Sequence, residues 1–200
     1  MMPLRVLYRA TGIAGLLMIA AAGPALAHTG EGVAGGFVSG LMHPVFGLDH
    51  LVAMVAVGLW GAFLGAPAIW ILPLVFPLVM AAGAALGIAG MPLPAVEMGI
   101  AASALVLGLM VAMAAKPPLW IAAAIVGLFA VFHGHAHGTE LPEAANPLAY
   151  AAGFVLSTGL LHAAGIALGL LAGSHAGRLA VRGMGAAIAL LGAAFLMGMA

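Results

Sequence analysis

The sequence predicts an all-α membrane protein that crosses the bilayer several times. Two thirds of the residues are apolar (66%) and only 5% are charged, which is far less charge than a soluble domain carries. The apolar residues form long runs separated by proline and polar residues. The 30 glycines follow no fixed period, which excludes a collagen and is typical of membrane helices that pack closely.

Composition also excludes several kinds of site. The chain has no cysteine, so disulfides and thiolate metal sites are excluded and any metal ligand must be nitrogen, oxygen or thioether sulfur. The formal net charge is zero, so we expect no nucleic-acid partner.

The first 27 residues have the order of a secretory signal peptide. Arg5 and Arg9 precede an apolar run at 12–22, and Ala25-Leu26-Ala27 forms a small-x-small cleavage site. The run is short for a membrane span, so we expect cleavage after Ala27 and a membrane domain over residues 28–200. The alternative is an uncleaved first membrane helix.

Six apolar runs then approach the length of about 20 residues that crosses about 30 Å of hydrocarbon. The breaks between them contain proline or polar residues, which end helices. The fourth run is short unless its helix continues into the His-rich segment that follows it. The expected spans are 35–64, 67–89, 96–114, 119–132, 147–171 and 179–199.

The few positive charges orient these spans. If the mature N-terminus is outside, Lys116, Arg178 and Arg182 all fall on the cytoplasmic side, as the positive-inside rule requires. Six spans then return the C-terminus to the outside. We therefore expect a bacterial inner-membrane protein with both mature ends in the periplasm.

The first polar cluster is His43-Pro44-Val45-Phe46-Gly47-Leu48-Asp49-His50, inside the first expected span. Ionisable groups in hydrocarbon are costly unless they are paired, buried in the bundle or bound to an ion, so each is a functional candidate. His43 and His50 are seven residues apart and share a helix face, with a step in depth of about 10 Å. Pro44 predicts a kink, because proline cannot donate to the carbonyl of Gly40.

Asp49 has two readings next to this pair. Its carboxylate either ligates a metal directly or orients the imidazole of His50 from behind. The alternative for the whole cluster is a buried polar network that only fixes helix packing.

The second polar cluster is Phe132-His133-Gly134-His135-Ala136-His137-Gly138-Thr139-Glu140, at the end of the fourth span. If the helix continues, His133, His137 and Glu140 line one face, whereas His135 points elsewhere. The alternative is a solvated loop that collects metal without transporting it.

The expected topology brings both clusters into the outer half of the membrane. His162, in the fifth span, reaches a similar or greater depth. We therefore expect a descending ladder, from a His-rich mouth through His43 to Asp49, His50 and His162 near the midplane. For His162, a hydrogen bond to a neighbouring carbonyl is an equally good explanation.

A cleaved N-terminus adds one more candidate. The free amine and imidazole of His28 would chelate one ion together, aided by Glu31, although N-termini are usually mobile. Imidazole and carboxylate without thiolate favour Ni²⁺, Co²⁺ or Zn²⁺ over Cu(I), and residue type alone does not rank these three ions.

With these two motifs, the chain resembles the HupE/UreJ family of bacterial membrane proteins along its whole length. The resemblance implies a nickel permease, sometimes a cobalt permease, with a functional link to hydrogenase or urease maturation. It rests on His43-Pro44-x-x-Gly47-x-Asp49-His50 and on the second cluster. The metal-handling residues that it implies are His43, Asp49, His50, His133, His135 and Glu140.

We therefore expect a permease, not an enzyme, that carries Ni²⁺ or Co²⁺ from periplasm to cytoplasm and needs no prosthetic group. The chain has no nucleotide-binding loop, so it does not itself hydrolyse ATP. Three other classes stay open at this point. They are an electron-transfer protein with haem on its histidines, a membrane metallohydrolase with Asp49 or Glu140 as base, and an accessory or sensor subunit that binds metal without flux.

Overall fold

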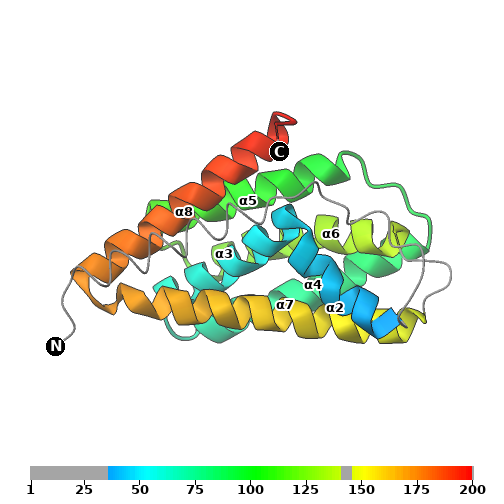
Figure 1. Cartoon of the computed structure of the whole chain (residues 1–200), viewed down its shortest axis with the longest axis horizontal. Helices are drawn as coiled ribbons and strands as arrows, with labels where there is room; N and C mark the ends of the chain where they lie inside the picture. Colours follow the sequence, from blue (N-terminus) through cyan, green and yellow to red (C-terminus); the bar gives the residue numbers. More distant parts are fainter. Residues whose placement is uncertain (1–35, 141–145, 200) are drawn as a thin grey trace.

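The computed structural model describes residues 36–140 and 146–199, and every regular element in these two ranges is helical (Figure 1). The expected signal peptide over residues 1–27 lies outside the described residues, and so do His28 and Glu31. The elements are α2 (Gly36–Phe46), α3 (Leu48–Leu64), α4 (Ala68–Ile88), α5 (Val96–Ala112), α6 (Leu119–Thr139), α7 (Pro147–Gly169), the 3₁₀ turn η1 (Leu170–Gly173) and α8 (His175–Leu196).

Four of these segments are long and apolar enough to cross a membrane: α4, α6, α7 with η1, and α8. The bent pair of α2 and α3 makes a fifth candidate when it is taken as one span. α5 is apolar but shorter, with 17 residues. The all-helical expectation is confirmed for the described residues, and they hold four to five candidate spans by length and composition.

The first expected span differs from a single kinked helix. Pro44 lies inside α2, and the chain bends by 79° between α2 and α3. The break falls at Gly47, which has extended backbone angles (φ −82°, ψ 102°) and precedes α3. A Cβ on Gly47 would lie 3.2 Å from both Asp49 Oδ1 and His50 Nδ1, so this turn favours a residue without a side chain. Asp49 then sits in the first turn of α3, where a negative charge stabilises a helix.

The fourth span does continue into the His-rich segment. α6 ends only at Thr139, so all three of its histidines lie on one uninterrupted helix. After residues 141–145, which the structure does not describe, the side chain of Asn146 accepts a 3.0 Å hydrogen bond from the backbone N–H of Ala149 and caps α7.

The helices associate in pairs through glycine. α4 packs along α6, α5 along α8, and α7 along both α2 and α3 (Figure 1). A Cβ on Gly134 of α6 would collide with the Met80 carbonyl of α4, and one on Gly192 of α8 would collide with the Leu105 amide of α5. Such backbone contact without side chains is typical of helix pairs in lipid.

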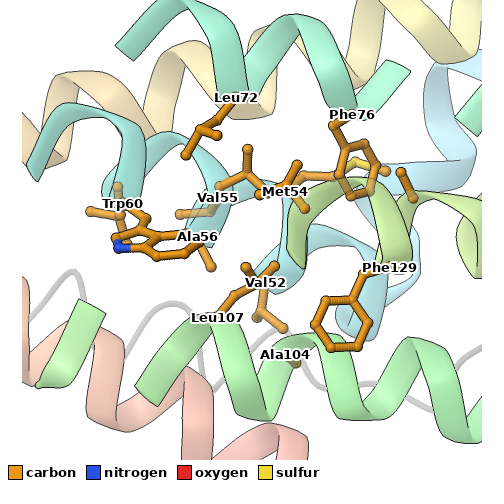
Figure 2. Packing of buried hydrophobic residues seen from close by; sticks show 14 of the residues in the cluster. Val52, Met54, Val55, Ala56, Trp60, Leu72, Phe76, Ala104, Leu107 and Phe129 are labelled. Atoms are coloured by element: carbon orange, nitrogen blue, oxygen red, sulfur yellow. The ribbon is translucent and has the colours of Figure 1, made fainter. Parts of the chain in front are cut away.

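The apolar core is built around α3, which is buried along most of its length. Trp60 and Met54 of α3 meet Leu107 of α5 and Phe76 of α4 in one cluster of buried side chains (Figure 2). The indole N–H of Trp60 donates a 3.0 Å hydrogen bond to the Ala115 carbonyl, so even the polar atom of this residue has a partner.

The three basic residues used to orient the chain lie at one end of the bundle. Arg182 Nε donates to the Ala112 carbonyl at the end of α5, at 2.7 Å. Lys116 Nζ lies 5.3 Å from the ring centre of Phe63, near the end of α3. Arg178 donates to a carbonyl of η1 at 3.4 Å. Positive charges near the carbonyl ends of helices are favourable, so these contacts also stabilise this end.

The glycine contacts give a matched test on one helix. We expect Gly192→Ala to destabilise the protein by about 1–3 kcal/mol, because the new methyl group meets the α5 backbone. Gly183→Ala, also on α8, places its methyl group in open space and gains up to about 1 kcal/mol of helix propensity. Thermal unfolding of both variants in detergent would measure the difference. Equal midpoints would show that the close α5–α8 contact does not contribute to stability.

Candidate metal centre

Three histidines from three helices converge at one point in the bundle. They are His43 of α2, His50 of α3 and His137 of α6, and one nitrogen from each lies within 4.8 Å of the others. The ring centre of His137 is 4.7 Å from that of His43 and also 4.7 Å from that of His50. Nitrogen ligands lie about 2.1 Å from a metal ion, so small rotations of the three rings would bring them into range of one ion.

The bend at Gly47 creates this convergence. A continuous helix would separate His43 and His50 by about 10 Å in depth, whereas their ring centres are 5.8 Å apart. The expected difference in depth between these two residues is therefore wrong, and both belong to one site. The reason is that the break turns α3 by 79° immediately before Asp49 and His50.

Asp49 lies behind His50 and is not one of the three converging groups. His50 Nδ1 donates a 2.8 Å hydrogen bond to Asp49 Oδ1, and the backbone N–H of His50 donates to the same oxygen at 2.8 Å. Since Nδ1 faces the carboxylate, Nε2 is the nitrogen of His50 that is left for a ligand, and it is buried without a hydrogen-bond partner. Of the two readings of Asp49, this geometry corresponds to the one in which the carboxylate orients an imidazole.

His133 completes the group one helical turn before His137. Its ring centre lies 5.0 Å from that of His50. Nδ1 donates to the Phe129 carbonyl at 2.9 Å, which leaves the lone pair on Nε2. His133 Nε2 is buried without a hydrogen-bond partner, as are both ring nitrogens of His137.

These unpartnered nitrogens argue for a ligand. A buried polar atom without a hydrogen bond costs about 1–3 kcal/mol, and four such atoms lie on three neighbouring rings. A network that only fixed helix packing would pair these nitrogens with one another or with carbonyls. A metal ion would satisfy several of them at once, because neutral imidazole is a common metal ligand.

The other candidates are not among the three converging histidines. His135 Nε2 donates to the Met91 carbonyl at 2.7 Å, so it points away from His133 and His137, as the helical spacing predicts. Glu140 is the C-cap residue of α6 and is exposed. His162 is buried against Phe76, with ring centres 5.4 Å apart. His28 lies outside the described residues.

Two aromatic residues of α7 border the cluster, and sequence reasoning did not select them. The Phe154 ring centre is 4.1 Å from that of His137, and the Tyr150 ring centre is 6.2 Å from that of His43. They are spaced by four residues in an apolar span, which does not distinguish them from ordinary packing residues. Both also line a cavity of about 100 Å³ beside His137, whose other walls are apolar residues of α4, α6 and α7.

Comparison with known proteins agrees with the two motifs. Residues 16–195 match the family model described as HupE / UreJ protein. The chain belongs to this family. Protein HupE of Rhizobium leguminosarum bv. viciae is 49% identical over 176 residues, which cover 88% of this chain and 92% of that protein. No solved structure matches.

The hydrogen bond from His50 makes a prediction about metal affinity. Asp49→Asn keeps the shape of the side chain but weakens the acceptor that holds the proton on Nδ1, and it removes the nearby negative charge. We expect the affinity for Ni²⁺, Co²⁺ and Zn²⁺ to fall by about 10–100-fold, the usual effect of losing such an orienting partner. Isothermal titration of purified protein in detergent would measure it.

The matched control is His175→Gln. His175 is exposed at the start of α8, at the end of the bundle where the basic residues lie. It should bind metal as the wild type does. If Asp49→Asn bound as tightly as this control, the orienting role of Asp49 would be wrong.

Proposed function

We propose that this protein is an inner-membrane permease that carries Ni²⁺, with Co²⁺ as the alternative ion, from periplasm to cytoplasm. The observation that carries the proposal is the convergence of His43, His50 and His137 inside a multi-pass membrane protein. Membership of the HupE / UreJ family supports the same reading, since nickel or cobalt transport is what the resemblance implies.

The donor set suits such an ion. The candidate ligands are His43, His50, His137 and His133, with Asp49 behind them; His135, Glu140, His162 and His28 would act elsewhere along the route. Imidazole nitrogens bind Ni²⁺ and Co²⁺ well without demanding a thiolate, and the chain has no cysteine. The ion is the substrate, and no prosthetic group is part of the proposal.

Six spans follow when α2 and α3 count as one and α5 counts as a full span. At 1.5 Å per residue, the 17 residues of α5 extend about 25 Å, and 17 residues lie at the lower limit for a membrane helix. The basic end of the bundle would face the cytoplasm. The histidine cluster, near the opposite end of α6, would then face the periplasm, with both mature ends of the chain on that side.

The competing classes fit the geometry less well. Haem would need a pocket several times larger than the cavity of about 100 Å³ beside His137. A hydrolase would need a polar substrate cavity, whereas the walls of this one are apolar apart from His137 and Tyr150. An accessory or sensor subunit would bind metal at the same cluster, so it differs from a permease only in the absence of flux. A supply of metal to hydrogenase or urease maturation is the partner link that we propose.

Measuring metal-ion uptake into liposomes distinguishes a permease from an accessory or sensor subunit. We expect wild-type protein to admit Ni²⁺ or Co²⁺ to liposomes that contain a metal-sensitive dye, with less uptake of Zn²⁺. His137→Gln should abolish this uptake, because His137 contacts both other ligands. His175→Gln should leave the rate unchanged.

Titration of the same preparations with metal decides between the alternatives. Metal binding without uptake by the wild type would contradict the permease and favour a sensor or accessory subunit. Uptake that survives in His137→Gln would show that the route does not pass through this cluster.

A further inference from the structure

Phe76 contacts both the histidine cluster and His162. Its ring centre is 5.3 Å from that of His133 and 5.4 Å from that of His162. The Phe76 side chain is fully buried and belongs to the core cluster in which α4 meets α3 (Figure 2). A single apolar ring thus contacts two buried polar positions.

These positions lie at different depths. The helix ends Ile88, Thr139 and Pro147 lie at the same end of the bundle, where they line or adjoin the cavity beside His137. Counted from there, His133 lies six residues along α6, Phe76 twelve residues along α4 and His162 fifteen residues along α7. His162 is therefore the inner position.

The surroundings of His162 supply oxygen donors. The Thr158 hydroxyl, one turn earlier on α7, is buried without a partner, and the only partner found for the His162 imidazole among the described residues is a backbone carbonyl. The Pro73 carbonyl of α4 lies beside the imidazole. Pro77 has no N–H, so the helical donor that this carbonyl would normally have is missing.

We propose that His162, the Thr158 hydroxyl and the Pro73 carbonyl form a second, inner station for the metal ion, and that the Phe76 ring is the barrier between the two stations. This inference rests on the proposed permease function. Three to four imidazoles bind the ion at the outer cluster, whereas one imidazole and two neutral oxygens bind it more weakly inside. Conduction requires several sites from which the ion can leave, and an apolar constriction blocks ions until it opens.

The competing explanation is that His162 only satisfies the free Pro73 carbonyl, as side chains often do near proline in membrane helices. His162→Gln keeps a donor for that carbonyl and removes the imidazole. Thr158→Val keeps the shape of the side chain and removes the hydroxyl. Ser157→Ala, at the buried neighbouring position of α7, is the matched control.

We expect His162→Gln and Thr158→Val to titrate with Ni²⁺ at the outer cluster as the wild type does, while Ni²⁺ uptake into liposomes falls about tenfold or more. Ser157→Ala should show wild-type uptake. Wild-type uptake by His162→Gln would overturn the inner station. A loss in Ser157→Ala equal to that in Thr158→Val would also overturn it, because it would trace the effect to helix packing.

Phe76→Ala tests the barrier, with Phe76→Leu as an apolar control that fills more of the space. We expect Phe76→Ala to admit protons in the absence of metal, read by a pH-sensitive dye inside the liposomes, while Phe76→Leu stays tight. A proton-tight Phe76→Ala with unchanged Ni²⁺ uptake would overturn the barrier. Absence of uptake by the wild type itself would instead overturn the permease, and the inner station with it.

Discussion

The close backbone contact between helices at glycine is the constraint on which the rest of the structure depends. Lipid gives helices no hydrophobic reason to associate, so packing at small residues holds the bundle together. The contacts also position the site. His137 lies between Gly134 and Gly138 of α6, which pack against the carbonyls of Met80 and Ala84 on α4. The glycines of the second motif thus press one face of α6 onto α4, and His133 and His137 are held towards α2 and α3.

The first motif depends on a different use of glycine. The sequence correctly indicates that His43 and His50 lie close together. It attributes this to a shared face of one helix, whereas in the structure the bend between α2 and α3 brings them together. Spacing arguments assume a continuous helix, but the extended backbone of Gly47 interrupts the helix between His43 and His50. The proline that was expected to bend the chain stays inside α2. A one-residue break of this kind leaves no periodic signal, because the residues on both sides remain apolar and helical.

Contacts between residues far apart in the chain are the other feature that could not be predicted from the sequence. The sequence left open whether the fourth span continues into the His-rich segment, and α6 shows that it does. The separate direction of His135 then follows from spacing within this one helix. The partner of His135, the Met91 carbonyl, lies 44 residues away, and the border formed by Tyr150 and Phe154 comes from another helix altogether. Spacing does not encode which helices become neighbours. The packing of α7 against α2 and α3 brings those aromatic rings to the histidines.

The charge of the cluster bears on how it would hold a metal ion. The Asp49 carboxylate lies directly against the imidazole of His50. A divalent ion bound by the histidines would lie in a medium of low dielectric constant, where an uncompensated charge is costly. The carboxylate would offset part of that charge through the imidazole that it orients. Asp49 thus has two effects on an ion at this cluster, one on the direction of a ligand and one on the local charge.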